Sequence, residues 1–170
     1  MLYSHPQARS FVADALVTRI RALHIEPDVI AGTATAAIGW AALVADRLKL
    51  PFVYVRAKAK EHGAKKRIEG DLPEGKDVVL VEDLLSTGGS AMSSVEALRD
   101  EGKATVTDVV AICSYEMEAS LEGAQQQRVK LHPLCPFSLL IDVAVEMGKI
   151  SNDDASLARS FVKDPTGWQS

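Results

Sequence analysis

Short runs of valine, isoleucine and leucine alternate along this chain with longer stretches in which apolar residues recur at helical spacing. The runs fall at about residues 28–31, 52–55, 77–81, 106–115 and 128–131, and the helical stretches at about 7–23, 35–48, 89–101, 117–127, 136–147 and 152–162. Buried strands that alternate with helices are typical of βαβ units around a parallel sheet. The run at 106–115 is almost continuously apolar, which favours a central strand. The sequence therefore predicts an α/β fold, with a central, mostly parallel β-sheet flanked by helices.

The length of 170 residues predicts a single domain that spans residues 1–170. No apolar run approaches the roughly 20 residues of a membrane span, and the first residues lack the basic and apolar regions of a secretory signal. We therefore expect a cytoplasmic protein without a membrane partner. Cys113 and Cys135 lack metal-ligand spacing, and we expect both to be reduced structural thiols rather than redox or catalytic groups.

The most informative stretch is residues 78–90, where a buried strand meets two carboxylates and then runs through hydroxyls and glycines into a helix. Glycine permits positive φ, so consecutive backbone N–H groups can converge on an anion at the helix N-terminus. Ser86, Thr87 and Ser90 add hydroxyl donors. The stretch lacks the lysine of a Walker A loop and the G-x-G-x-x-G of dinucleotide folds. It therefore predicts a phosphate-binding turn of another kind.

The acidic pair Glu82 and Asp83 conflicts with a site for phosphate alone, because carboxylates repel phosphate. A ribose 5-phosphate resolves the conflict, since its ring hydroxyls can donate to the carboxylates while its phosphate takes the amides. The pair could also stabilise positive charge that develops at C1 of the ribose. The alternative that the two acids only cap a turn stays open.

A second strand turns through Gly32 into a helix that has Thr33 and Thr35 near its start. Either threonine could be an ordinary N-cap. The interest of this turn is its position, because the carboxyl ends of parallel strands lie along one edge of a sheet. We therefore expect two anion-binding turns side by side.

The connection at residues 56–67 carries six cations and one anion, a charge of +5, whereas the whole chain is −4 and the remainder is therefore −9. A solvated charge run and a nucleic-acid patch are the alternatives. Nucleic acid is disfavoured because the rest of the chain is acidic and no aromatic residue interleaves with these cations. A long flexible loop that closes over a polyphosphate leaving group and excludes water fits better. His62 could donate a proton or a hydrogen bond to that group, or lie exposed in solvent.

Together these sites call for a ligand with a monophosphate, a ribose and a departing polyphosphate, which is the shape of phosphoribosyl pyrophosphate (PRPP). The chain resembles the type I phosphoribosyltransferases, whose motif of an apolar strand, two acids and a Thr-Gly-Gly turn matches residues 79–90. Within that group it is similar to the orotate phosphoribosyltransferases, at residues 32–36, 54–63, 68–70 and 166–169.

This resemblance implies a reaction of PRPP with orotate to give orotidine 5′-monophosphate and pyrophosphate. It implies Mg²⁺ that is bound mainly through PRPP and pyrophosphate, with no metal ligand assigned to the protein. It also implies a homodimer in which the basic loop reaches the neighbouring active site. The catalytic residues would be Lys60, His62 and Asp83. The substrate-binding residues would be Thr33, Ala34, Thr35, Arg56, Lys58, Lys60, His62, Glu82, Asp83, Leu84, Leu85, Ser86, Thr87, Gly88, Gly89 and Ser90.

Two departures from the family fall on the pocket for the base. Family members carry a longer N-terminal segment that forms a hood over the base, and we expect this chain to lack it. Some members also place an arginine for the carboxylate of orotate at the end of the strand that reads Ser114, Tyr115, Glu116 here. The alternatives are therefore a phosphoribosyltransferase for another nucleobase and a non-catalytic PRPP-binding regulatory protein.

Overall fold

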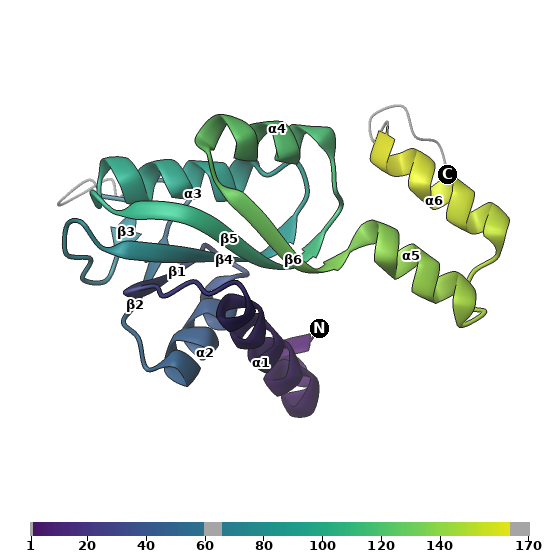
Figure 1. Cartoon of the computed structure of the whole chain (residues 1–170), viewed down its shortest axis with the longest axis horizontal. Coiled ribbons are helices and arrows are strands. Elements are labelled where there is room, and N and C mark those ends of the chain that lie inside the picture. The colour runs from purple at the N-terminus through teal and green to yellow at the C-terminus, as the bar shows by residue number, and fades with distance from the viewer. Residues whose placement is uncertain (1, 60–65, 164–170) are drawn as a thin grey trace.

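The computed structural model describes residues 2–59 and 66–163, and a six-stranded sheet lies at its centre (Figure 1). The strand order is β3-β2-β1-β4-β5-β6, and every neighbouring pair is parallel except β2 and β3. The predicted α/β class with a mostly parallel sheet is therefore confirmed. The strands are β1 (Val29–Thr33), β2 (Phe52–Val55), β3 (Ile68–Glu69), β4 (Asp77–Leu85), β5 (Thr105–Ser114) and β6 (Lys130–Pro136).

Helices cover both faces of this sheet. Figure 1 shows α1 and α2 on one face and α3 and α4 on the other. A short 3₁₀ helix, η1 (Leu2–Ser4), precedes them. The helices are α1 (Pro6–Ala22), α2 (Ile38–Leu48), α3 (Gly89–Asp100), α4 (Glu118–Gln127), α5 (Phe137–Glu146) and α6 (Asn152–Lys163).

Successive side chains along each strand point to opposite faces of the sheet, so the core has two layers, one on each face. On β4, Val78 and Leu80 pack in the layer beneath α3 and α4, whereas Val79 and Val81 pack in the layer beneath α1 and α2. Helix α2 can approach β1 closely only because Gly32 has no side chain. A Cβ at that position would lie 2.8 Å from Cβ of Ala41.

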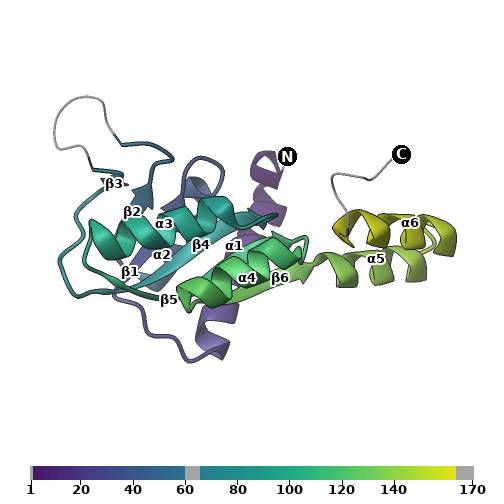
Figure 2. The ribbon, with the colours of Figure 1, turned by 90° about the horizontal axis from the view of Figure 1, so that it is seen from above.

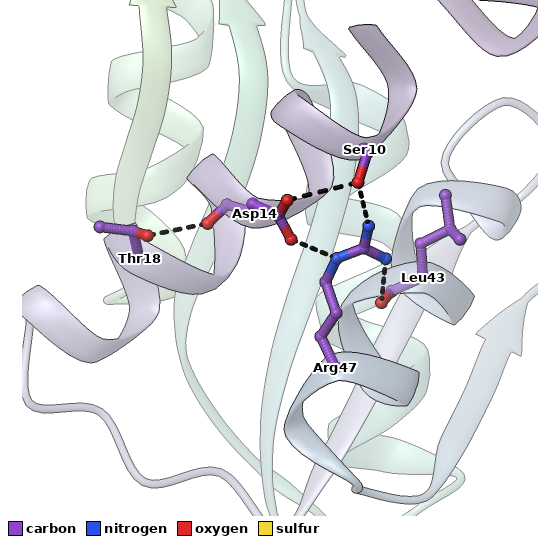
Figure 3. Close-up of polar contacts among 5 residues, drawn as sticks. All are labelled: Ser10, Asp14, Thr18, Leu43 and Arg47. Carbon is purple, nitrogen blue, oxygen red and sulfur yellow. Dashed lines mark hydrogen bonds and ion pairs between the residues drawn. The ribbon is translucent and has the colours of Figure 1, made fainter. Parts of the chain in front are cut away.

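A polar clamp joins α1 to α2 (Figure 3). The Arg47 guanidinium on α2 donates to the Asp14 carboxylate, to the Ser10 hydroxyl at 3.0 Å and to the Leu43 carbonyl at 3.2 Å. Because Ser10 and Asp14 are one turn apart on α1, one side chain fixes both helices against each other. The clamp holds the two helices together over the layer of the core that they cover.

Helices α5 and α6 form a hairpin that projects beyond the edge strand β6 (Figure 2). Their apolar side chains are only partly covered, and Leu139, Leu140, Val143, Met147 and Leu157 are between 40% and 64% exposed. Among the residues that the structure describes, no helix is both long and apolar enough to cross a membrane.

The boundaries differ from the sequence-based expectation at three informative places. The strand predicted for 77–81 continues to Leu85, so the acidic pair lies within β4 rather than after it. Residues 34–37 form turns, and α2 starts at Ile38 instead of Thr35. The predicted loop between β2 and β4 contains the short strand β3, which pairs antiparallel with β2. Residues 60–65 of that loop lie outside the described residues.

Candidate active site

The two predicted anion-binding turns lie side by side at the carboxyl edge of the sheet. Strands β1 and β4 are parallel neighbours, with Gly32 opposite Val81. Thr33 is the last residue of β1, while Ala34 and Thr35 form the turn that follows and are joined by a cis peptide bond. The expectation that both turns share one edge is confirmed.

Glu82 is buried although it carries a carboxyl group. Its side chain is only 4% exposed and lies on the α3 side of the sheet, close to the Thr33 hydroxyl. Its Oε1 accepts the backbone N–H of Asp83 at 3.1 Å. Burial and the neighbouring Asp83 carboxyl raise the pKa of Glu82 to about 7. Glu82 therefore changes its protonation state near neutral pH.

Two buried polar atoms lie beside each other near the ends of β1 and β4, and both are available for further hydrogen bonds. Thr33 Oγ1 and Glu82 Oε2 are buried, and apart from the closeness of the two side chains to each other neither atom has a hydrogen-bond partner in the described ranges. A buried polar atom without a partner costs about 1–3 kcal/mol. Both atoms lie next to the edge where the turns meet, which is where a ligand with hydroxyl or anionic groups would satisfy them.

Asp83 faces the opposite layer from Glu82. It lines a cavity of about 440 Å³ together with Trp40, Leu84, Cys113 and Tyr115. Most of the lining is apolar or aromatic, which is the character of pockets that hold flat organic rings. The side chain of Leu84 is 39% exposed at this rim, whereas Leu85 is fully buried in the core and could meet a ligand only through its backbone.

Tyr3 forms a further wall of the same cavity and was not predicted from the sequence. Its ring stacks on Trp40 with centroids 4.5 Å apart, and its hydroxyl donates to the Ala36 carbonyl at 2.7 Å. Partial burial raises the pKa of Tyr3, and the nearby Asp83 carboxylate adds to that effect. No motif surrounds Tyr3 in the sequence, so only its position in space connects it with Asp83.

The predicted phosphate turn wraps a small cavity of about 40 Å³ between β4 and α3. Ser86 and Thr87 lead to Gly88, which has a φ of +79°, and Gly89 and Ser90 open α3. The backbone of Gly88 packs directly against α4, since a Cβ there would lie 2.9 Å from Ser120 Oγ. Only glycine fits this combination of conformation and contact.

A third cavity, of about 240 Å³, lies between the two turns on the α3 side. Thr33, Ala34, Ser90, Ser93 and Arg67 contribute to its lining. Arg67 belongs to the basic segment at 56–67, but its side chain was not singled out from the sequence. Arg67 is far from both turns in the sequence, so its place in this cavity could not be predicted from local patterns. It depends on the pairing of β3 with β2.

The other predicted cations of the basic segment are placed differently. The Arg56 guanidinium pairs with the Glu69 carboxylate at 3.2 Å, and Lys58 is exposed. Lys60 and His62, both predicted to be catalytic, lie outside the described residues. The structure therefore positions the two ends of the basic segment beside the third cavity.

No group of three His, Cys, Asp or Glu side chains that could hold a metal ion occurs within 2–59 and 66–163. Cys113 and Cys135 are free and half-buried, and they lie opposite each other on β5 and β6. Burial raises the pKa of the Cys113 thiol, with the Cys135 thiol adding to the effect. Both cysteines contribute to the wall of the large cavity.

Comparison with known proteins links this site to one group. Residues 1–130 match the family described as the phosphoribosyl transferase domain. An orotate phosphoribosyltransferase of Levilactobacillus brevis is 47% identical over 165 residues, which cover 97% of this chain and 78% of that protein. The matched region includes both turns and both carboxylates.

Solved structures agree with the sequence relatives. The crystal structure of orotate phosphoribosyltransferase from Aeropyrum pernix superposes with a TM-score of 0.75 at 29% identity, covering 88% of this chain and 81% of that one. The structure of Leishmania donovani UMP synthase gives a TM-score of 0.80 at 25% identity, covering 95% of this chain but only 34% of that longer chain.

Proposed function

Since this chain belongs to the orotate phosphoribosyltransferase family, we propose that it transfers the 5-phosphoribosyl group of PRPP to orotate and releases pyrophosphate. The products are orotidine 5′-monophosphate and pyrophosphate, so the chain acts as a glycosyltransferase in pyrimidine nucleotide synthesis. The cytoplasmic location expected from the sequence is part of this proposal.

The observation that carries the proposal is the arrangement of Glu82 and Asp83 at the end of β4. One carboxyl faces the α3 side, next to the phosphate turn, and the other faces the apolar cavity on the α2 side. A ribose that lies across the end of the strand can place its 5-phosphate in the turn at 86–90. Its C1 then points toward the cavity, where a planar base can stack.

The chemistry follows from this placement. The bond between C1 and the pyrophosphate oxygen breaks while a ring nitrogen of the base bonds to C1, and the proton of that nitrogen is released to the departing pyrophosphate or to water. Positive charge builds up on the ribose ring, and the Asp83 carboxylate lies where it can stabilise that charge. Glu82 accepts hydrogen bonds from the ribose hydroxyls, and Thr33, Ala34 and Thr35 hold the leaving pyrophosphate. The backbone N–H groups and hydroxyls of residues 86–90 hold the 5-phosphate.

The carboxylates are oxygen donors of the kind that Mg²⁺ prefers, and a Mg²⁺ site commonly combines one or two carboxylates with substrate phosphates. The proposal has Mg²⁺ held mainly by PRPP oxygens, with Glu82 or Asp83 reached through the ribose. When bound, Mg²⁺ would neutralise charge on the leaving pyrophosphate.

The proposal includes a homodimer whose basic loops cross between active sites. Lys60 and His62 would then bind or protonate pyrophosphate in the neighbouring subunit, with Arg56 and Lys58 at the start of the loop. Support for self-association comes from the α5–α6 hairpin, on which several apolar side chains are exposed. Exposed apolar surfaces of this kind mark interaction sites in proteins.

A neutral nucleobase is the second candidate acceptor. Orotate is an anion, but no lysine, arginine or histidine of the described residues lines the large cavity, and Asp83 adds a negative charge to it. This lining favours an uncharged ring unless a cation comes from Lys60, His62 or another subunit. The comparison of acceptors is therefore the decisive assay.

The test is to incubate the purified protein with PRPP and Mg²⁺ and to offer orotate, uracil, hypoxanthine or adenine separately. Release of pyrophosphate and formation of the nucleotide are measured by chromatography. We expect turnover with orotate. Turnover with another base but not with orotate would show that this other base is the acceptor. Tight PRPP binding without turnover of any base would identify a non-catalytic PRPP-binding protein.

A further inference from the structure

Arg67 is the cation that the described part of the fold holds most firmly beside the two anion-binding turns. Its Nη1 donates to both the carbonyl and the hydroxyl oxygen of Ser93, each at 3.1 Å, on the first turns of α3. Its Nε donates to the Arg56 carbonyl at 2.9 Å, and its backbone N–H donates to Glu101 at 2.8 Å. Ser93 and Arg56 therefore fix the guanidinium, whereas Lys58 is exposed.

No carboxylate in the described ranges pairs with the Arg67 guanidinium, since Glu101 bonds only the backbone N–H of this residue. Its guanidinium contacts carbonyl and hydroxyl oxygens only, and it makes no ion pair with a residue in the described ranges. Arg56 differs, since its guanidinium already pairs with Glu69. A half-buried cation without a counter-ion leaves a positive potential in the adjacent space.

That space is the cavity of about 240 Å³ between the two turns, which Arg67 lines together with Thr33, Ser90 and Ser93. Thr33 is 5% exposed, and beyond the nearby Glu82 carboxyl its buried hydroxyl has no hydrogen-bond partner among the described residues. Within the described part of the chain the cavity thus combines a cation without an ion-pair partner, the buried Thr33 hydroxyl and serine hydroxyls near the start of a helix. An anion with several oxygens would satisfy all of these groups at once.

We propose that Arg67 binds the pyrophosphate group directly and positions it between the Thr33 turn and α3. This inference rests on the proposed function. It adds Arg67, the last residue of the basic segment, to the residues that bind pyrophosphate. Arg67 also accepts the backbone N–H of Arg56 at its carbonyl and donates from Nε to the Arg56 carbonyl, so it couples the occupied cavity to the beginning of that segment. Arginine stays charged throughout the pH range of an ordinary assay, so the binding of pyrophosphate by Arg67 does not depend on titration of its side chain.

The test compares Arg67→Gln with the neighbouring Lys66→Gln, because Lys66 is exposed and its loss changes the net charge equally. Binding of inorganic pyrophosphate and of orotidine 5′-monophosphate to each protein is measured by calorimetry, in the presence of Mg²⁺. We expect Arg67→Gln to weaken pyrophosphate at least about tenfold and to raise the KM for PRPP similarly. We expect the nucleotide to bind within about twofold of the parent, and Lys66→Gln to change neither ligand by more than that.

Arg67→Lys separates charge from geometry, because lysine keeps the charge but cannot hold Ser93 and Arg56 together. We expect it to recover less than half of the lost affinity for pyrophosphate. The proposal is overturned if Arg67→Gln binds pyrophosphate as the parent does, or if it weakens both ligands equally, which would indicate a purely structural role. An inactive parent that binds no PRPP would instead overturn the proposed function.

Discussion

The backbone N–H of Asp83 donates to the Glu82 carboxylate at 3.1 Å, yet the two side chains face opposite layers of the sheet. Consecutive strand residues alternate between faces, and β4 continues through both acids. The two acids therefore line different cavities, Glu82 the small one at residues 86–90 and Asp83 the large one beside Trp40.

The raised pKa of Glu82 predicts a specific dependence of stability on pH. The folded pKa is about 7 and the ordinary value is 4.5, so between these values the folded state binds more protons than the unfolded state. The stabilisation is fully present below pH 4.5 and is lost as pH rises through 7, and it amounts to about 3 kcal/mol. Glu82→Gln should flatten this part of the profile.

Urea unfolding of the parent and of Glu82→Gln at pH 5, 6, 7 and 8 measures the effect. Glu74→Gln, at an exposed position, serves as the control and should follow the parent. If the profiles of the parent and Glu82→Gln stay parallel across this range, Glu82 does not titrate with the raised pKa.

Asp83→Asn should abolish turnover without unfolding the protein. The carboxylate is half-buried in the lining of the large cavity, and its proposed role is to stabilise charge on the ribose rather than to pack. We expect kcat to fall by about a hundredfold or more and the free energy of unfolding to change by less than about 1 kcal/mol. Asp71→Asn, at an exposed site, is the matched control. A variant that keeps normal turnover would remove Asp83 from the mechanism.

Gly88→Ala should destabilise the protein much more than Gly89→Ala does. Gly88 has a φ of +79° and no room for a Cβ beside Ser120, whereas a Cβ at Gly89 would meet no atom closer than 3.9 Å. We expect a cost of more than about 1 kcal/mol at Gly88 and little change at Gly89, as measured by thermal unfolding. Equal effects at the two glycines would contradict the packing of the phosphate turn on α4.

Mixed dimers test whether the basic loop crosses between subunits. Lys60→Ala and Asp83→Ala should each be inactive alone, but a hybrid dimer keeps one intact site if Lys60 serves its neighbour. Random exchange of equal amounts would restore about a quarter of the parental activity. Mass spectrometry of differently tagged subunits verifies the exchange. Verified hybrids without activity would show that each loop serves its own chain.

Local signals in the sequence predict much of this fold and of its phosphate chemistry. The apolar runs that became β1, β4 and β5 predict the parallel sheet, and the glycines with hydroxyls at 86–90 predict the turn before α3. These features depend on residues that are close together in the chain. That both turns lie at one edge then follows, because the carboxyl ends of parallel strands meet at the same edge of a sheet.

The features that were missed depend on contacts between distant residues. Tyr3 reaches the large cavity because η1 packs on α2, and Arg67 lines the same cavity as Thr33 because β3 turns back along β2. The end of β4 was also placed too early, because an acidic pair ordinarily ends a strand. Here β5 supplies partners as far as Leu85, so pairing outweighs the low strand propensity of Glu82 and Asp83.

The two borders of the sheet bear on how the protein behaves at high concentration. At one border β3 has only two residues, and at the other β6 contains Pro133 and Pro136, which have no N–H to offer. A strand from another molecule would find few free donors and acceptors in register at either border. The fold therefore resists fibril-like stacking of its sheets, even though its central strands are rich in valine.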